Sequence, residues 1–430
     1  GYISSVILQI PEAEMTLVAL SPSVFFVTIA SVMRGYFNGR EKISVTAKSQ
    51  TLEQVFKTIL TIVVVEIVGF TTNLNTALMS AGANLATTLS VLLSFGYLTL
   101  YYNIYKKGIA EEIKNSVNYK KESVLTLVKK ILFVSTPITL SAIMSTLNKN
   151  IDSITVVRGL KKFLSEAEAK AQYGILSGKV DTLTTLPLSF NIAFATALVP
   201  YVSSAIAKGE KENAGKRISF SILVSILIGL PCTIGMMVFS EQIIGLLFPN
   251  ATNGALLLQV TAVTIIFSVL AQTVNGALQG LGKIMVPAIT STIGLLVKLF
   301  MNIKLIPIPE IGVYGAAIAS IVNNIVAFGL SYIVLAKNIK LDLKFGKCVI
   351  KPIIATAIMG ICSYYLYFIL SGIISTRIAT IIAIVFAIII YLLAVVALKI
   401  LSKEEIKMIP YGTKIVKMLE KLGIYAKEVE

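Results

Sequence analysis

Residues 26–57, FVTIASVMRGYFNGREKISVTAKSQTLEQVFK, recur in altered form as residues 267–298, FSVLAQTVNGALQGLGKIMVPAITSTIGLLVK, at a constant offset of 241. The identical pairs are Phe26 and Phe267, Ala30 and Ala271, Gly35 and Gly276, Gly39 and Gly280, Lys42 and Lys283, Ile43 and Ile284, Val45 and Val286, Ala47 and Ala288, Thr51 and Thr292, and Lys57 and Lys298. Apolar composition accounts for several matches, but not for two glycines and two lysines in register. The pattern predicts an internal repeat: an apolar helix, a tight turn with glycine and lysine, and a second apolar helix containing a lysine.

The composition predicts an integral membrane protein. Apolar residues make up 56% of the chain and charged residues 14%, against roughly 45–50% and about 25% in soluble proteins. Apolar runs, mostly long enough to cross a hydrocarbon core, occupy residues 17–37, 52–72, 76–103, 123–148, 171–204, 216–240, 255–279, 285–306, 312–336, 350–371 and 376–401. We therefore expect eleven transmembrane helices, and a repeat among such helices indicates a duplicated transporter fold.

The net charge of +16 is concentrated in alternate loops. Basic residues gather at 34–48, 104–130, 208–217, 283, 337–351 and 399–427, and the loops between these segments are poor in them. The positive-inside rule then places the basic segments and the C-terminus in the cytoplasm, so the charge does not indicate nucleic-acid binding. Residues 149–170 are expected to be an outside loop despite their basic residues, with Asp152 and Arg158 stabilising that loop.

The repeat also predicts that the sequence is a piece of a longer protein with fourteen helices. The second bundle begins near residue 123, so the same offset places the start of the first more than a hundred residues before Gly1. The expected division is 1–103 for helices four to six of an N-terminal six-helix bundle, 104–122 for a basic cytoplasmic linker, 123–336 for a C-terminal six-helix bundle (helices seven to twelve), 337–401 for a further helix pair (thirteen and fourteen), and 402–430 for a cytoplasmic amphipathic tail.

Two local features predict further helices. Ser165 followed by Glu168 is a capping box that should open a helix at about residue 166. In the tail, Ile415, Met418, Leu419 and Leu422 alternate with lysines. This pattern predicts an amphipathic helix, either on the inner membrane surface or exposed to solvent.

Three stretches, residues 21–57, 173–210 and 275–317, carry a resemblance to a known family. They include SPSVFFVTIASVMRGYFNGREKIS, YGILSGKVDTLTTLPLSFNIAFATALVPYVSSAIAKGE and NGALQGLGKIMVPAITSTIGLLVKLFMNIKLIPIPEIGVYGAA. Here the chain resembles the stage V sporulation protein B group of polysaccharide-biosynthesis transporters, in the multidrug/oligosaccharidyl-lipid/polysaccharide (MOP) exporter superfamily. The resemblance implies an all-α, polytopic, MATE-type two-bundle fold of fourteen helices around a cavity open to each side in turn. It also implies a polyprenyl-linked sugar precursor as substrate.

One motif of a related branch, the murein-precursor flippases, is altered. That branch typically carries Asp-Arg shortly before the proline of the eighth helix, where this chain has Asp181 and Thr182, with Lys179 two residues earlier. Phosphate binding at this position would need Lys179 in place of the arginine.

Charged residues within the apolar runs are the first candidates for a substrate site: Lys57, Lys298, Lys179, Asp181 and Glu66. A charge near the bilayer centre costs at least about 2.5–3.5 kcal/mol on insertion scales, so it normally faces a cavity or a partner. Lys57 and Lys298 hold equivalent places in the repeat and would suit a pyrophosphate between them. Alternatively each lysine pairs with an acid or extends to the cytoplasmic surface; Glu53 is a ready partner for Lys57, and Lys298 has no acid within a turn.

Lys179 and Asp181 are two residues apart and therefore lie on different faces of a helix, so one of them is expected in the cavity. Amides in or near the spans, among them Asn191, Gln272, Asn275, Asn302, Asn323 and Asn324, could recognise sugars or form hydrogen bonds between helices. Arg34, at the end of its helix, is expected to anchor at the inner surface.

The main functional hypothesis is a flippase that moves a polyprenyl-linked oligosaccharide or peptidoglycan precursor from the inner to the outer leaflet. Such a protein is a transporter and not an enzyme. The alternatives are a MATE-type multidrug or cation antiporter using Asp181, Glu66 or Glu53, a membrane-embedded glycosyltransferase, and a structural protein of envelope or spore assembly. The chain has no histidine, and its three cysteines are isolated, so neither a metal site nor any cofactor is expected. The expected partners are the substrate and membrane lipids, with a monomeric protein in the plasma membrane and no nucleic acid.

Overall fold

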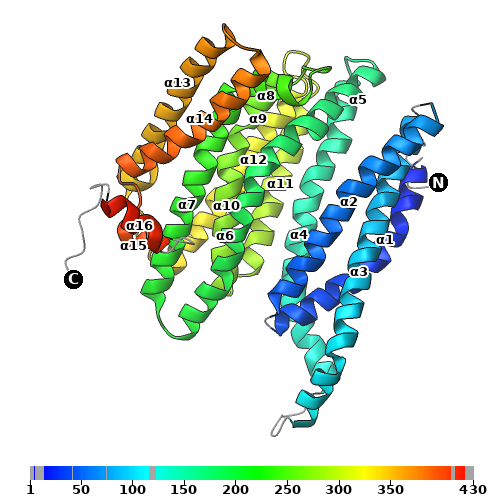
Figure 1. The fold of residues 1–430 in the computed structure, drawn as a ribbon, viewed down its shortest axis with the longest axis vertical. Helices are drawn as coiled ribbons and strands as arrows, with labels where there is room; N and C mark the ends of the chain where they lie inside the picture. The colour runs from blue at the N-terminus through cyan, green and yellow to red at the C-terminus, as the bar shows by residue number, and fades with distance from the viewer. Residues whose placement is uncertain are drawn as a thin grey trace. The chain divides into compact units, whose positions relative to one another are not determined.

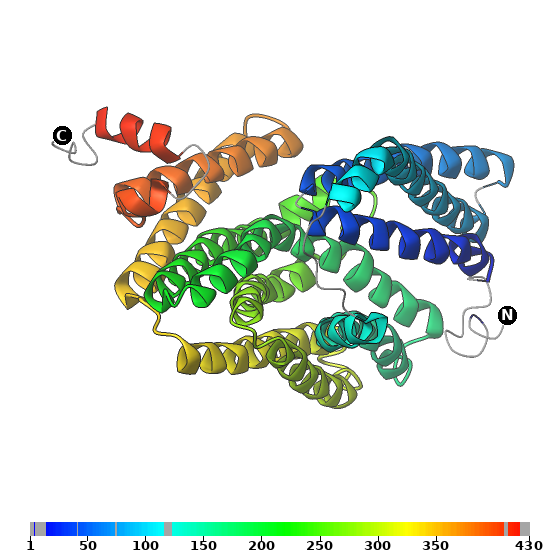
Figure 2. The ribbon, with the colours of Figure 1, turned by 90° about the horizontal axis from the view of Figure 1, so that it is seen from below.

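The computed structural model describes residues 4, 14–40, 42–73, 75–115, 123–407 and 412–421, which form helices and no strand. Within these ranges, eleven helices are long and apolar enough to cross a membrane, as the sequence predicted. The chain divides into two units, Gly1–Glu122 and Ser123–Glu430. Figures 1 and 2 show both units from two directions.

The first unit is a group of three long helices, α1 (Glu14–Gly39), α2 (Ile43–Thr71) and α3 (Thr76–Asn115). Helix α3 packs against both α1 and α2. Ala30, Phe37, Val45 and Leu98 form its small buried core. Because α3 continues to Asn115, the first part of the expected 104–122 linker is helical; residues 116–122 lie outside the described residues.

The second unit contains the remaining helices. They are α4 (Val124–Leu160), α5 (Glu166–Gly174), the π-helical turn η3 (Ile175–Val180), α6 (Asp181–Ala207), α7 (Lys211–Val238), α8 (Ser240–Leu247), α9 (Ala255–Thr261), α10 (Val263–Gly280), α11 (Met285–Leu305), α12 (Tyr314–Asn338), the π-helical turn η4 (Gly346–Ile350), α13 (Lys351–Ser371), α14 (Thr376–Ala397), α15 (Lys403–Lys407) and α16 (Gly412–Lys421). Helix α10 packs against α6, α7 and α12, and α11 lies against α4 and α12. The pair α13 and α14 packs on this unit through contacts of α13 with α7 and of α14 with α8 (Figure 2).

The internal repeat is present in the structure. Helix α1 spans Glu14–Gly39, and the second copy, α9 with α10, spans Ala255–Gly280, so both ends are 241 residues apart. The turns also share their hydrogen bonds: the backbone N–H of Lys42 donates to the Phe37 carbonyl at 2.9 Å, and that of Lys283 donates to the Leu278 carbonyl at 2.8 Å. The same local sequence therefore builds the same helix and turn twice.

The capping box predicted from Ser165 and Glu168 is formed. The Glu168 backbone N–H donates to Ser165 Oγ, and the Ser165 backbone N–H donates to Glu168 Oε2, which together satisfy two amide groups at the start of α5. Helix α5 begins at Glu166, where the sequence placed it.

The tail forms two short helices whose apolar side chains pack onto the chain itself. Val416 and Leu419 of α16 join Ile406 in a buried cluster beside Val396 and Leu401, whereas Met418 is 56% exposed. Ion pairs of Lys403 with Glu420 and of Lys347 with Glu405 accompany this packing. The side chain of Ile415 and the whole of Leu422, both assigned to the apolar face from the sequence, lie outside the described residues.

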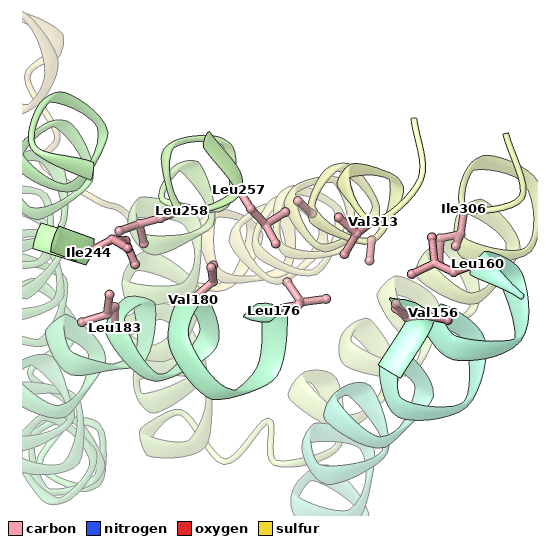
Figure 3. Close-up of a cluster of buried hydrophobic side chains, with 13 residues drawn as sticks. Val156, Leu160, Leu176, Val180, Leu183, Ile244, Leu257, Leu258, Ile306 and Val313 are labelled. Carbon is pink, nitrogen blue, oxygen red and sulfur yellow. The ribbon is translucent and has the colours of Figure 1, made fainter. Parts of the chain in front are cut away.

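Two buried apolar clusters lie at different levels of the second unit. The first cluster joins the end of α4 to η3, α8, α9 and the start of α12, and Figure 3 shows its side chains pointing toward one another. The second joins the far ends of α6, α10 and α12 to the start of α7. The helix segments between these levels carry the polar side chains described next.

Candidate functional site

Residues of the second unit line a partly open cavity of about 380 Å³, between the levels of the two apolar clusters. Side chains of α4, α6, α9, α10, α11 and α12 line it. The lining residues are Met144, Asp152, Asp181, Thr184, Thr185, Leu188, Thr261, Thr264, Ser268, Ala271, Gln272, Asn275, Ser291, Lys298, Ser320, Asn323, Asn324 and Ala327. Most of them carry a hydroxyl or an amide, so the cavity offers many hydrogen-bonding groups within a helical unit of mainly apolar composition.

The charged centre of the cavity wall is an ion pair between α11 and α4. Lys298 is 4% exposed, and its Nζ lies 2.5 Å from Asp152 Oδ2. Asn302, one turn further along α11, donates to Asp152 Oδ1 at 3.0 Å and to Thr155 Oγ1 at 2.9 Å. Both carboxylate oxygens of Asp152 therefore have partners, and the charge of Lys298 is balanced across the helix contact.

This pair corrects the predicted role of Asp152. The sequence placed Asp152 and Arg158 in an outside loop, but both lie on α4, which runs without a break from Val124 to Leu160. The segment is less apolar than a typical span because one side carries Asp152 and Thr155 toward α11, while Val156 and Leu160 enter the apolar cluster of Figure 3. Lys298, which lacks an acid within a turn of its own helix, obtains one from a helix 146 residues earlier in the chain.

Lys179 and Asp181 are directed to different places, as their spacing predicted. Lys179 Nζ donates to the carbonyls of Ala251 and Asn253, at 2.5 and 3.2 Å, and lies over the ring of Phe248. Asp181, the first residue of α6, lines the cavity. Of this pair, Lys179 secures the loop after α8, and Asp181 reaches the candidate site.

The predicted amides also differ in their surroundings. Asn191 is fully buried and donates to the Val269 carbonyl, Gln272 Oε1 and Thr273 Oγ1, and it accepts a hydrogen bond from Ser225. It therefore links α6, α7 and α10 without lining the cavity. Gln272 lines the cavity and accepts from Asn191, and Asn275 lines it while accepting from Ser331 at 3.1 Å.

Lys57 lies in the first unit, where it is exposed on α2. Its expected partner Glu53 instead pairs with Arg34, at 2.6 Å. Arg34 also donates to Ser49 Oγ at 2.9 Å and to Ser94 Oγ at 2.7 Å, so it holds α1, α2 and α3 together. The expectation that Arg34 anchors at the inner surface stays a prediction, and the structure adds its partners on α2 and α3.

Sequence reasoning missed the hydroxyl side chains of the site. They lie three or four residues from other polar lining residues on otherwise apolar helices: Thr264 and Ser268 precede the predicted amide Gln272 on α10, and Ser320 precedes the predicted amide Asn324 on α12. Such spacing places side chains on one helix face, and it was readable from the sequence. In the described part of the chain, no three His, Cys, Asp or Glu side chains gather as a metal site would require.

Comparisons with known proteins agree with this architecture. Stage V sporulation protein B of Bacillus subtilis (strain 168) is 26% identical over 401 residues, which is 92% of this chain and 75% of that protein. The lipid II flippase MurJ of the same organism is 22% identical over 363 residues, 83% of this chain and 66% of that protein.

Solved structures show the same fold. A lipid II flippase MurJ in an inward closed conformation matches with a TM-score of 0.59 at 15% identity, over 88% of this chain and 72% of that one. An outward-facing multidrug resistance MATE family transporter of the MOP superfamily matches with a TM-score of 0.58 at 16% identity, over 78% of this chain and 75% of that one. The model of the family described as lipid II flippase MurJ matches residues 12–383. The chain therefore belongs to the lipid II flippase MurJ family of the MOP superfamily.

Proposed function

We propose that this protein moves a polyprenyl-linked oligosaccharide or peptidoglycan precursor from the inner to the outer leaflet by alternating access. Family membership supports transport of a lipid-linked precursor. The observation that carries the proposal is the polar cavity lined by membrane-length helices of the second unit.

The physical need for such a cavity follows from the substrate. A sugar headgroup loses its hydrogen bonds to water when it enters hydrocarbon, and each unsatisfied group costs several kcal/mol. The serine, threonine and amide side chains that line the cavity would replace those bonds during passage. A volume of about 380 Å³ lies within the roughly 300–1,000 Å³ of ligand sites.

Orientation and location complete the proposal. The basic loops would face the cytoplasm, which places the C-terminus there and the protein in the plasma membrane. The first unit would supply helices four to six and the second unit helices seven to fourteen of the fourteen-helix fold. We propose a monomeric transporter that catalyses no reaction.

The pyrophosphate of such a substrate needs cationic partners. Lys298 suits this role poorly because its Nζ already lies 2.5 Å from Asp152 Oδ2 in a buried pair. Lys179 is likewise engaged with two carbonyls. Among the lysines singled out from the sequence, exposed Lys57 of the first unit is the one we propose for the pyrophosphate.

A MATE-type cation antiporter is the second candidate. It is favoured by one observation: Asp181 brings a carboxylate to the cavity wall, where it could attract a cationic solute. In this alternative, Asp181→Asn would abolish transport of a cationic dye.

One experiment distinguishes the flippase from the antiporter. The full-length protein is placed in proteoliposomes with a fluorescent polyprenyl-pyrophosphate glycan, and accessibility of the sugar to an external enzyme is followed over time. A small cationic dye is the parallel substrate, and protein-free liposomes are the control. Movement of the lipid without the dye supports the flippase. Movement of the dye alone, against a proton or sodium gradient, replaces it with the antiporter.

A further inference from the structure

A proline lies inside the membrane-length helix α7, and another helix supplies the hydrogen bond that this proline removes. Pro231 has no backbone N–H, so the carbonyl of Leu227, four residues earlier, loses its usual helical donor. The hydroxyl of Tyr391, on α14, donates to the Leu227 carbonyl oxygen at 2.9 Å. The helical turn from residue 227 to residue 231, here named the Pro231 turn, is therefore completed by a side chain 164 residues later in the chain.

The surroundings of this hydrogen bond are apolar. Tyr391 is 7% exposed and belongs to a buried cluster that includes Leu223 of α7 and Met359 of α13. Leu227 packs against the same cluster. A carbonyl without a partner is costly where no water can replace the lost bond. The Tyr391 hydroxyl therefore stabilises α7 at the point where its own backbone cannot.

A donor from another helix is not a general requirement of prolines in this chain. Pro22 lies inside α1 and frees the carbonyl of Val18 in the same way. That carbonyl accepts a hydrogen bond from the Ser21 hydroxyl at 3.0 Å, within the same helix. The link from α14 to the Pro231 turn is thus a particular feature of α7, and it joins two helices that are far apart in the sequence.

The Pro231 turn also contacts a helix that lines the polar cavity. Gly229 follows Leu227 by two residues and so lies on another face of α7. A Cβ on Gly229 would lie 2.9 Å from Ile266 Cδ1 and 3.3 Å from Ile266 Cα, so α7 and α10 come close together here. Ile266 lies between Thr264 and Ser268 of α10, and both of these line the cavity. The Pro231 turn therefore lies between Tyr391 and the cavity wall.

The helix pair α13 and α14 reaches the cavity only indirectly. Among the described residues, the lining side chains come from α4, α6, α9, α10, α11 and α12. The hydrogen bond of Tyr391 and the packing of α13 on α7 connect the pair to α7, and α7 packs on α10. A change in the pair can thus alter the cavity through the Pro231 turn.

We propose that Tyr391 is a positioning residue of the transporter. Its hydroxyl replaces the hydrogen bond that Pro231 removes, and it thereby lets α13 and α14 fix the shape of α7 against the cavity-lining helix α10. The effect on transport rests on the proposed function, whereas the role of the hydroxyl in α7 is testable without it.

A double-variant cycle tests the hydrogen bond. Tyr391→Phe removes only the hydroxyl, so the thermal unfolding temperature in detergent should fall by roughly 3–8 °C. Pro231→Ala restores a backbone N–H that can donate to the Leu227 carbonyl. In that background, Tyr391→Phe should lower the unfolding temperature by less than about a third as much. Tyr365→Phe, at an exposed tyrosine of α13, is the matched control and should leave the unfolding temperature unchanged.

The assignment of the hydroxyl is overturned by either of two results. One is an equal fall of the unfolding temperature on adding Tyr391→Phe to the parent and to Pro231→Ala, because the hydroxyl would then act independently of the proline. The other is no fall in the parent, because the Leu227 carbonyl would then not need the Tyr391 hydroxyl.

Transport tests the effect on the cavity. Proteoliposomes with equal amounts of folded protein, kept below the unfolding temperature of every variant, receive the fluorescent polyprenyl-pyrophosphate glycan. Tyr391→Phe should slow its transport by roughly 2–30-fold relative to Tyr365→Phe. Added to Pro231→Ala, the same substitution should slow transport less than about twofold, since the backbone then supplies the bond.

The outcomes separate the two levels of the proposal. If folded Tyr391→Phe transports like Tyr365→Phe, the hydroxyl only stabilises the fold and the link to the cavity is wrong. If Pro231→Ala moves no lipid, the comparison of Tyr391→Phe with Tyr365→Phe decides alone. If the parent moves no lipid, the proposed function fails instead, and the unfolding cycle still decides whether Tyr391 completes α7.

Discussion

The ion pair between Lys298 and Asp152 predicts a specific pattern of stability in single and double variants. The Nζ and Oδ2 atoms lie 2.5 Å apart, and both side chains are at most 10% exposed. Asp152→Asn leaves one acceptor oxygen for two donors, Lys298 Nζ and Asn302 Nδ2. Lys298→Met leaves a buried carboxylate whose charge is unbalanced.

Breaking a buried pair from one side typically costs about 3–5 kcal/mol, whereas replacing both partners is often close to neutral. Each single variant should therefore lose about that amount. The double variant Asp152→Asn with Lys298→Met should recover most of it, because Asn302 can still donate to the new amide oxygen. The coupling between the two sites is then several kcal/mol, well above the usual tolerance for independent substitutions.

Thermal unfolding of the four proteins in detergent measures this coupling. We expect each single variant to unfold roughly 5–15 °C below the parent and the double variant to lie within about 3 °C of it. Lys208→Met, at an exposed lysine that follows α6, is the control and should change little. If the losses of the single variants simply add in the double variant, the two side chains do not interact and the reasoning is refuted.

Two further predictions concern close packing and the first unit. Gly276→Ala should lower the free energy of unfolding by about 1–3 kcal/mol, because the added Cβ would lie 2.6 Å from the Ala195 carbonyl oxygen. Gly235→Ala is the control: nothing lies within 4 Å of its added Cβ, so the unfolding temperature should not fall. Arg34→Lys should speed hydrogen exchange across residues 43–71, since the guanidinium reaches Ser49 from Nε and Glu53 and Ser94 from Nη2, and the one nitrogen of an ammonium cannot occupy both places. Unchanged exchange would contradict the bridging role.

The sequence predicted the fold well because apolar length and capping are local properties. Eleven apolar runs predicted the eleven membrane-length helices found among the described residues, and the Ser165 capping box opened α5 at the expected residue. The repeat located matching helix ends because both copies close with the same turn: the first helices end at Gly39 and Gly280, and the backbone N–H groups of Lys42 and Lys283 donate to carbonyls five residues earlier.

The site was harder to predict because its contacts join distant parts of the chain. The partner of Lys298 lies on α4, in a segment whose Asp152 and Arg158 resemble loop residues when only mean hydropathy is considered. Equivalent positions in the repeat also suggested equivalent surroundings for Lys57 and Lys298. Lys57 is exposed, however, and Lys298 is in a buried ion pair. Helix packing decides such differences, and the repeat pattern holds no information about it.

The π-helical turn Ile175–Val180 affects how this chain should be aligned with its relatives. A π turn contains about one more residue than an α turn, and each α-helical residue advances the side chain by about 100°. Residues before Ile175 are therefore rotated by about one position relative to those after Val180. An alignment with a relative that is α-helical throughout needs a one-residue gap between these two residues. Without that gap, the residue matched to Asp181, which lines the cavity, comes from a different helix face.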